Sequence, residues 1–257
     1  MLLDRPRRSL HLRATMCTLI IGIDRPRARH LLLGANRDES LARAAVSPHA
    51  LVRDPLIVAG RDSVAGGTWF GLQAGRLAVA ILNRNTPEGD ASRWVAGTEP
   101  DRSRGLVCLD ALRMNSAAEA ITWVKDEVLT CRYAPFTLFV ADERGAFAAY
   151  WDGRMRVEEL FPGWHVLTHG DIDDPFDARS ELLHTSLRVA PPRTIEDLVP
   201  LLSSHEGSRA VCLHTDPHGT VSSSLLHVDW NSGVARYLHA AGRPCTTPYQ
   251  DISRLLG

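Results

Sequence analysis

Apolar residues gather in short runs along the chain, and polar turn segments separate these runs. TLIIGI (18–23) and HLLLGA (30–35) lie on either side of the polar segment DRPRAR, a pattern that predicts a β-hairpin. LAVAIL (77–82) is apolar at every position, which predicts a strand buried on both faces. The stretch between these runs is rich in Pro and Gly and predicts loops with short edge strands.

Two helices are predicted in the middle of the chain. Ser116 and Glu119 have the spacing of a capping box, so a helix is expected over the following segment AAEAITWVKDEV. Another helix is expected just before it, over roughly 103–114.

Two more helices are predicted in the second half. Asp174 followed by Pro175 is typical of an N-cap and a first helical turn, and this helix is expected to end near Arg188. Thr194 is expected to cap a helix over IEDLVPLL (195–202). The other predicted strands are 136–141, 146–150, 164–168, 209–214, 220–228 and 233–239. Adjacent groups of strands with paired helices between them indicate an α+β fold, with helices segregated from largely antiparallel sheets.

The composition and net charge give no indication of binding to nucleic acid or to a membrane. The chain has 257 residues, of which 44% are hydrophobic and 23% charged, and its formal net charge is −1. A near-neutral chain has no global attraction to nucleic acid or to an anionic membrane surface. No apolar run reaches the roughly 18–20 residues that a membrane-spanning helix needs. The five cysteines form no CxxC pair, which favours free thiols and a reducing, cytoplasmic location.

The first residues differ from the rest. The segment MLLDRPRRSLHLRAT contains four arginines and lacks the apolar stretch of a secretory signal. We expect residues 1–16 to be a disordered leader that arises from a start codon upstream of Met16, and a propeptide or targeting segment is the alternative. Residues 17–257 are predicted to form a single domain without an internal boundary.

Cys17 acquires a special chemistry if the chain begins at Met16 and this methionine is trimmed. Cys17 then carries a thiol and an α-amine on the same carbon. The amine has an ordinary pKa of about 7.7–8.0 and the thiol one of about 8.5, so the amine can take up the thiol proton at neutral pH. On its own, a cysteine at the start of a strand is more often a small buried residue.

Polar residues follow two of the predicted strands directly. Asn36, Arg37, Asp38 and Glu39 come after the strand HLLLGA, where buried polar groups are costly unless they are paired. A carboxylate such as Asp38 can hold a protonated α-amine, and Arg37 can bind a carboxylate; a solvated turn is the alternative. Asn83 follows the strand LAVAIL in the same way, and its amide can donate a hydrogen bond to a tetrahedral oxyanion.

Four segments in this order resemble one known family. MCTLIIGI, GANRDES, GGTWFG (66–71) and AILNRN are similar to the NRDE family, which includes the transport and Golgi organisation protein 2 homologues. The first two also resemble the choloylglycine hydrolase and penicillin V acylase group. RAVCLHTDPHGTVSSSLLHVD, followed by GRPC, resembles the acyl-CoA:6-aminopenicillanic acid acyltransferase relatives. The resemblance covers nearly all of 16–249 and implies the four-layer αββα sandwich of the N-terminal-nucleophile hydrolases.

The resemblance also implies roles for individual residues. Cys17 matches the nucleophile, Asp38 the carboxylate near the terminal amine, and Asn83 the asparagine at the end of a core strand. His169 stands where a second oxyanion asparagine is expected, within WHVLTHGDIDDPFDARS. The residues expected to bind substrate are Asn36, Arg37, Glu39, Thr68, Trp69 and Arg84. Two departures leave the charge of the substrate open, because Ala35 and Val221 stand where these families have arginine.

The predicted function is that of an N-terminal-nucleophile cysteine hydrolase or acyltransferase that acts on a small linear amide. The alternative is a binding or trafficking protein without catalysis, of the Golgi-organisation or haem-handling type. Neither a cofactor nor a metal is expected. Histidines 205, 214, 218 and 227, taken with Cys212, match no metal-ligand spacing. A homo-oligomer is compatible with the sequence.

Overall fold

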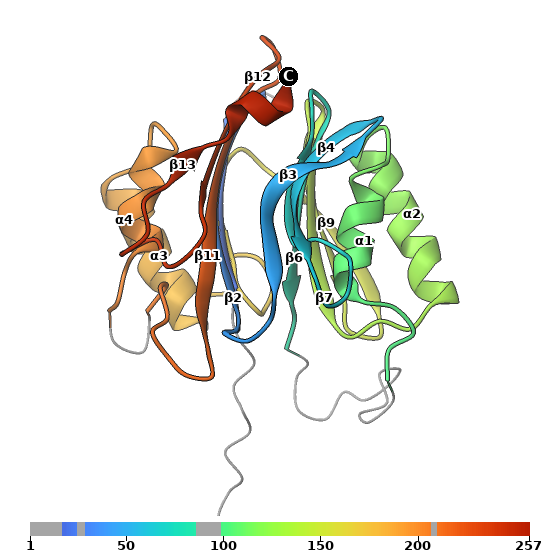
Figure 1. Cartoon of the computed structure of the whole chain (residues 1–257), viewed down its shortest axis with the longest axis horizontal. Coiled ribbons are helices and arrows are strands. Elements are labelled where there is room, and N and C mark those ends of the chain that lie inside the picture. The colour runs from blue at the N-terminus through green and yellow to red at the C-terminus, as the bar shows by residue number, and fades with distance from the viewer. Residues whose placement is uncertain (1–16, 25–28, 86–98, 207–209) are drawn as a thin grey trace, which may run out of the picture.

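Two antiparallel β-sheets pack face to face, and helices cover the outer face of each. The computed structural model describes residues 17–24, 29–85, 99–206 and 210–257. Figure 1 shows α3 and α4 outside one sheet and α1 and α2 outside the other, which makes the four-layer αββα order. The predicted α+β fold, a four-layer αββα sandwich with mostly antiparallel sheets, is confirmed.

The first sheet has the strand order β10-β1-β2-β11-β12-β13. Its strands are β1 (Thr18–Ile23), β2 (His30–Ser40), β10 (Gly163–Leu167), β11 (His218–Asp229), β12 (Val234–Ala240) and β13 (Gln250–Asp251). The second sheet runs in sequence order from β3 to β9. Its strands are β3 (Ala45–Arg53), β4 (Leu56–Asp62), β5 (Phe70–Gln73), β6 (Leu77–Asn83), β7 (Phe136–Asp142), β8 (Gly145–Trp151) and β9 (Met155–Leu160).

The helices lie between these groups of strands. They are α1 (Arg104–Ala111), α2 (Ala117–Thr130), α3 (Ala178–Val189) and α4 (Val199–Leu202), with 3₁₀ turns η1 (Glu196–Leu198) and η3 (Ser253–Leu256). The capping box of α2 is present, since Ser116 Oγ accepts a hydrogen bond from Glu119 N at 3.1 Å. Across the described residues, no helix is long and apolar enough to cross a membrane.

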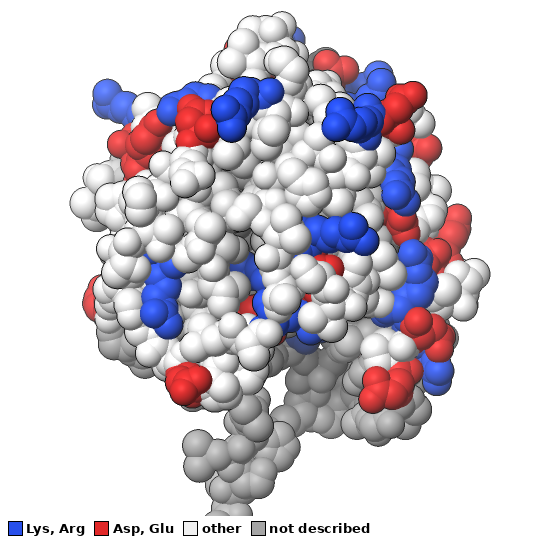
Figure 2. Space-filling view, viewed as in Figure 1, with Lys and Arg blue, Asp and Glu red and all other residues white. Residues whose placement is uncertain are grey.

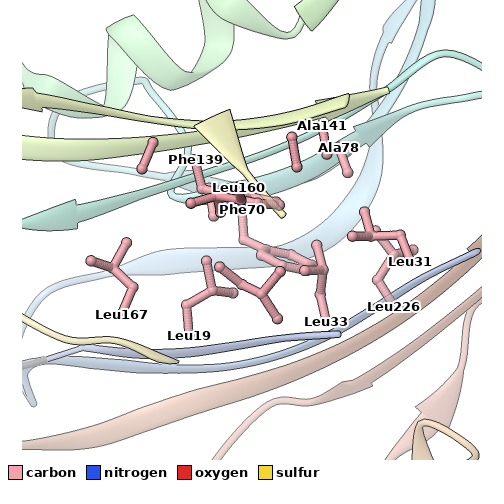
Figure 3. Close-up of a cluster of buried hydrophobic side chains, with 14 of the residues drawn as sticks. Leu19, Leu31, Leu33, Phe70, Ala78, Phe139, Ala141, Leu160, Leu167 and Leu226 are labelled. Atoms are coloured by element: carbon pink, nitrogen blue, oxygen red, sulfur yellow. The ribbon is translucent and has the colours of Figure 1, made fainter. Parts of the chain in front are cut away.

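Alternate side chains of the central strands enter two different cores. On β1, Leu19 and Ile21 point into the core between the sheets, whereas Ile20 packs against the outer helices. On β6, Ala80 faces the inner core and Val79 faces α1 and α2. This double burial explains why these strands are continuously apolar. Figure 3 shows the inner core, where labelled side chains of both sheets meet; they include Leu19, Leu33, Phe70, Phe139 and Leu226.

Three predictions about elements are wrong. Thr194 does not cap the helix near residue 195, since the N-cap there is Ile195 and it makes no side-chain cap hydrogen bond. Helix α3 begins one turn later than Asp174, because Asp174 Oδ1 closes a local turn by accepting from Phe176 N at 2.9 Å. Asp177 is the N-cap instead, and its Oδ1 accepts from Ser180 N at 2.7 Å. The predicted strand 209–214 is not a strand over its described residues, since the backbone N–H groups of residues 211 and 212 donate to Ser204 O.

Strands β3 and β4 are longer than the short edge strands predicted for this part of the chain. β3 and β4 form a long hairpin, although β3 contains Pro48. A proline is tolerated there because β3 is the edge of its sheet. β9 forms the opposite edge of the sheet. It was not predicted, because its sequence MRVEEL is largely polar. On the face in Figure 2, basic and acidic side chains lie interspersed, in keeping with the near-neutral net charge.

Candidate active site

Cys17 directly precedes β1, and the neighbouring strand β2 holds its thiol. Strand β1 pairs with β2 so that Thr18 lies opposite Asn36. Asp38 N donates a hydrogen bond to Cys17 Sγ over 3.4 Å, and the thiol approaches Asp38 O at 3.6 Å. The sulfur is therefore fixed by main-chain atoms of the NRDE segment.

The thiol opens into a small polar cavity at the end of the sandwich. The cavity has a volume of about 80 Å³. Its lining comes from both sheets and from the start of α1, and consists of Cys17, Arg37, Asp38, Glu39, Arg43, Asp62, Thr68, Trp69, Ile81, Asn83, Ser103, Arg104 and Gly105. The fold thus brings together predicted residues from all four segments of the resemblance: MCTLIIGI, GANRDES, GGTWFG and AILNRN.

Asp38 is a fully buried carboxylate with two side-chain partners. Thr220, its cross-strand neighbour on β11, donates from Oγ1 to Asp38 Oδ1 at 2.6 Å. Arg179 Nη1 lies 3.4 Å from Asp38 Oδ2. Burial raises the pKa of Asp38 to about 6, and Arg179 and Thr220 act against this rise by stabilising the carboxylate.

Arg179 is a site residue for which the sequence analysis gave no role. It projects from the first turn of α3 and is only 4% exposed. Its Nη1 also donates to Thr18 Oγ1 at 2.8 Å, so one guanidinium joins the residue after Cys17 to Asp38. One indication of this role is present in the sequence. Arg179 lies in the segment DARS, which is part of the region similar to the known family, but DARS is not itself a recognised motif.

Arg37 points to the other face of β2, into the cavity. Its guanidinium carbon lies 4.1 Å from the centre of the Trp69 ring, a cation–π contact. Its Nη2 is 3.4 Å from Asp62 Oδ2, which also accepts from Arg43 Nε at 2.7 Å. Burial lowers the pKa of Arg37, whereas the charges of Glu39 and Asp62 raise it. Asp62 and Arg43 were not predicted, because they lie outside the motifs.

Arg104 supplies a further positive charge to the cavity. It is the first residue of α1, and its Nη1 donates to Pro135 O at 3.0 Å. Burial lowers the pKa of Arg104, and the charges of Cys17 and Glu39 oppose that shift. Among the described residues, no carboxylate lies within ion-pair distance of Arg104. The sequence offered no signal for this residue, since helix starts are rich in polar side chains.

Glycines hold the GGTWFG segment against α1. A Cβ atom added to Gly67 would lie 2.2 Å from the carbonyl carbon of Gly105, so neither chain could keep its position. Thr68 N donates to Gly105 O at 2.9 Å across this contact. Trp69 O then accepts from Ile81 N at 2.9 Å, which joins the segment to β6. The close approach of two backbones thereby places Thr68 and Trp69 in the cavity wall.

The cavity strongly disfavours a thiolate while the nitrogen of Cys17 is part of a peptide bond. Burial and the nearby charge of Asp38 raise the pKa of the Cys17 thiol to about 12. The hydrogen bond from Asp38 N and the charge of Arg37 act in the opposite direction but do not outweigh the rise. A local base is therefore required before this sulfur can act as a nucleophile near neutral pH.

Three predicted site residues lie outside the cavity lining. Asn36 points to the outer face of β2, where its Nδ2 donates to Leu202 O at 2.8 Å and to Val211 O at 3.0 Å. Arg84 is engaged elsewhere, with Nε 3.0 Å from Asp152 Oδ2 and Nη1 donating to Gly170 O at 2.7 Å. His169 shares a separate surface pocket with Arg84, and its Nδ1 lies 3.6 Å from Asp177 Oδ2.

Comparison with solved structures finds one with the same fold and a second that is less similar. An N-acylethanolamine-hydrolyzing acid amidase ortholog from Caenorhabditis elegans superposes with a TM-score of 0.56 at 14% sequence identity, covering 85% of this chain and 94% of that one. A variant of conjugated bile acid hydrolase from Clostridium perfringens gives a TM-score of 0.49 at 11% identity, with 94% of each chain covered. A comparison with curated proteins found no match.

A family model identifies the chain more specifically. The model described as Transport and Golgi organisation 2 matches residues 16–237, which include Cys17, the NRDE segment and the whole cavity lining. The resemblance inferred from the four sequence segments is confirmed. The chain therefore belongs to the Transport and Golgi organisation 2 family.

Proposed function

We propose that this protein is an N-terminal-nucleophile cysteine hydrolase of small linear amides, active once Cys17 is the first residue. The observation that carries the proposal is the position of Cys17, which lines a polar cavity together with Arg37 and is held by main-chain atoms of Asp38, whose carboxylate is buried. An amide is the substrate bond we favour, and the structurally similar protein from C. elegans is described as an amidase.

A free α-amine on Cys17 is the base that the thiol needs. The unprotonated amine takes the thiol proton, and the thiolate attacks the amide carbonyl carbon. Asn83 Nδ2 donates to the oxyanion of the tetrahedral intermediate. The ammonium group returns its proton to the leaving nitrogen, which leaves a thioester on Cys17. Water then hydrolyses the thioester and releases the acid; an amine acceptor in place of water makes the same cycle an acyl transfer.

Asp38 supports this cycle by its charge. Its charge acts on Cys17, and Thr220 and Arg179 hold the carboxylate in place, so it stabilises the ammonium form of a terminal amine there. Three arginines line the cavity. Arg37 and Arg43 are engaged by Asp62, so Arg104 is the guanidinium that favours a substrate with a carboxylate or another acidic group near the amide. The cavity of about 80 Å³ accommodates only the reacting group, so the rest of the substrate extends towards solvent.

The maturation of residues 1–16 belongs to the same proposal. The family match begins at residue 16, one position before Cys17. A chain that starts at Met16 and loses this methionine exposes the amine, and residues 17–257 then act as one domain. A chain that keeps residues 1–16 retains the thiol in its high-pKa form and is suited only to a binding function without catalysis.

The test compares defined N-termini with one nucleophile variant. Intact mass spectrometry of the protein expressed from Met16 is expected to show a chain that begins at Cys17. This form is expected to hydrolyse members of a panel of N-acyl amides and to be alkylated by iodoacetamide at Cys17. Cys17→Ala is expected to lose turnover by at least about 10³-fold with an unchanged circular dichroism spectrum.

Cys131→Ser is the matched control, because Cys131 lies at the end of α2, outside the cavity lining. It is expected to retain full activity. Undiminished hydrolysis by Cys17→Ala, or equal hydrolysis by a chain whose Cys17 amine is still in a peptide bond, contradicts the proposal.

A further inference from the structure

Two cysteines and two histidines meet on the surface formed by the connection from α4 to β11 and the segment after β12. They are His205, Cys212, His214 and Cys245. One donor atom from each residue can be chosen so that all four lie within 4.8 Å of one another. Cys212 is buried, Cys245 is half-buried and both imidazoles are exposed, so the group is accessible to an ion from solvent. None of these residues lines the Cys17 cavity.

The distances within the group suit a tetrahedral metal site. Cys212 Sγ and Cys245 Sγ are 3.6 Å apart. Two thiolates bound to one zinc ion at about 2.3 Å stand about 3.8 Å apart at the tetrahedral angle. His214 Nε2 lies 3.1 Å from Cys245 Sγ and 3.8 Å from Cys212 Sγ, so small movements bring these three donors around one centre.

The second histidine is already oriented for the same centre. His205 Nδ1 lies 3.1 Å from Cys212 O and can donate a hydrogen bond to it. This contact fixes the ring and the tautomer and leaves Nε2 as the donor atom, as is usual for histidines that bind metals. The His205 and His214 rings stand edge to face with their centres 4.7 Å apart, which brings the two imidazoles to the same side of the cysteine pair.

We propose that His205, Cys212, His214 and Cys245 bind one zinc ion in a closed, structural Cys₂His₂ site. Two thiolates and two imidazoles are a donor set that favours Zn²⁺ over the hard cations Mg²⁺ and Ca²⁺. Four protein ligands leave no open coordination position, so the ion stabilises the fold and takes no part in catalysis. Sequence spacing did not foresee the site, because Cys245 joins from 33 residues beyond Cys212.

A bound zinc ion would hold the segment around Leu213 in place, and this segment contacts Asp38 through Thr220. Leu213, between two of the ligands, donates from its backbone N to Thr220 Oγ1 at 2.8 Å. That hydroxyl donates in turn to Asp38 Oδ1 at 2.6 Å. Because Leu213 N occupies an acceptor position of the hydroxyl, the hydroxyl hydrogen stays directed at the carboxylate. Asn36, through its bond to Val211 O, holds the same connection to β2.

The test measures metal binding by the reduced full chain. Zinc is removed with a chelator and returned as Zn²⁺, and the bound metal is counted by elemental mass spectrometry. One zinc ion per chain is expected. Co²⁺ in its place is expected to give the intense visible bands of a tetrahedral ion and a thiolate-to-metal charge-transfer band. Cys245→Ser and His214→Gln are expected to weaken Zn²⁺ binding by at least about 100-fold.

Controls keep the outcome specific. Cys131→Ser and His218→Gln remove a thiol and an imidazole outside the group and are expected to bind zinc as the parent does. Cys17→Ala is also expected to bind zinc fully, so a failure of the catalytic proposal leaves this one standing. Circular dichroism checks that each variant folds; His214, being exposed, can be changed without disturbing the core.

Three results would overturn the proposal. The first is absence of stoichiometric zinc in the reduced parent chain. The second is zinc binding that survives both Cys245→Ser and His214→Gln in folded protein. The third is purification of the chain from a reducing cytoplasm with a disulfide between Cys212 and Cys245, since oxidised sulfurs cannot serve as the two thiolate ligands.

Discussion

At the scale of single residues, Asp38 combines a buried position with a charge that the proposed chemistry needs. Its pKa rises from 3.8 to about 6 through burial. The folded protein therefore holds a proton on this group over a pH range in which the unfolded chain has released it. Stability attributable to Asp38 is fully present below pH 4 and is lost as the pH rises towards 6.

Asp38→Asn should reveal this dependence. The amide keeps the shape of the protonated carboxyl group but has no charge to desolvate. In the chain that keeps residues 1–16, the unfolding free energy of the parent, measured relative to Asp38→Asn by urea denaturation, is expected to fall by about 1–3 kcal/mol between pH 4 and pH 7. A parent-to-variant difference that grows with pH contradicts the raised pKa.

Arg104 is the residue best placed to select the charge of a substrate. Its guanidinium lines the cavity and, within the described chain, has no carboxylate partner of its own, whereas Arg37 is already near Asp62. Arg104→Met is expected to lower kcat/KM for an amide with a carboxylate by about 10–100-fold, the value of one charge-assisted hydrogen bond. A neutral analogue of the same length should be affected by less than about threefold.

The test of Arg104 depends on the difference between the loss of kcat/KM for the acidic amide and the loss for the neutral amide. Arg113→Met removes an exposed arginine that pairs with Asp110 near the end of α1, and it should leave both amides unaffected. Equal losses for the acidic and the neutral amide in Arg104→Met would assign Arg104 a structural role instead of charge selection.

At the scale of elements, the contact between the GGTWFG segment and α1 sets the shape of the cavity. Gly67→Ala is expected to lower the unfolding free energy by about 1–3 kcal/mol, because its Cβ would overlap the backbone of Gly105. Chemical denaturation measures the change. Gly145→Ala is the control, since a Cβ there has its nearest neighbour at 3.5 Å and is expected to change stability by less than about 1 kcal/mol.

A stable Gly67→Ala protein would show that the two backbones can separate without cost. The same variant should also lose activity on every substrate of the panel, because Thr68 and Trp69 move together with Gly67. This general loss distinguishes the variant from Arg104→Met, whose effect is confined to acidic substrates.

The sequence predicts best those elements that a local pattern of residues is enough to define. LAVAIL is apolar because each of its faces enters a core, and the capping box of α2 is a local hydrogen-bond pattern. Residues 210–214 look equally apolar, yet they form no strand over their described length. Val211 N and Cys212 N donate to Ser204 O, and Leu213 O accepts one bond from Thr220 N, whereas the strand neighbours of β11 are β2 and β12. Strand partners are decided by tertiary context, which a local pattern does not contain.

At the scale of the whole molecule, the motifs of the first third predicted much of the candidate site, because strand ends from both sheets converge there. Arg104 and Arg179 were not predicted because each reaches the site from a helix start of ordinary composition, and Asp62 was not predicted because it ends strand β4 outside the motifs. The group of His205, Cys212, His214 and Cys245 was not predicted for a related reason. It joins two connections that are distant in sequence, and only the pairing of β11 with β12 brings them together.

The alternation of side chains along β2 has a consequence for how this chain can vary. Asn36 and Asp38 face the helical layer, and Arg37 between them faces the cavity. Insertion or deletion of one residue within β2 ahead of this motif would turn every side chain to the opposite face. The Arg37 guanidinium would then leave the cavity, and the Asn36 amide and the Asp38 carboxylate would lose their partners Leu202 O and Arg179. Length changes are therefore excluded within β2, whereas the turns at its two ends can absorb them.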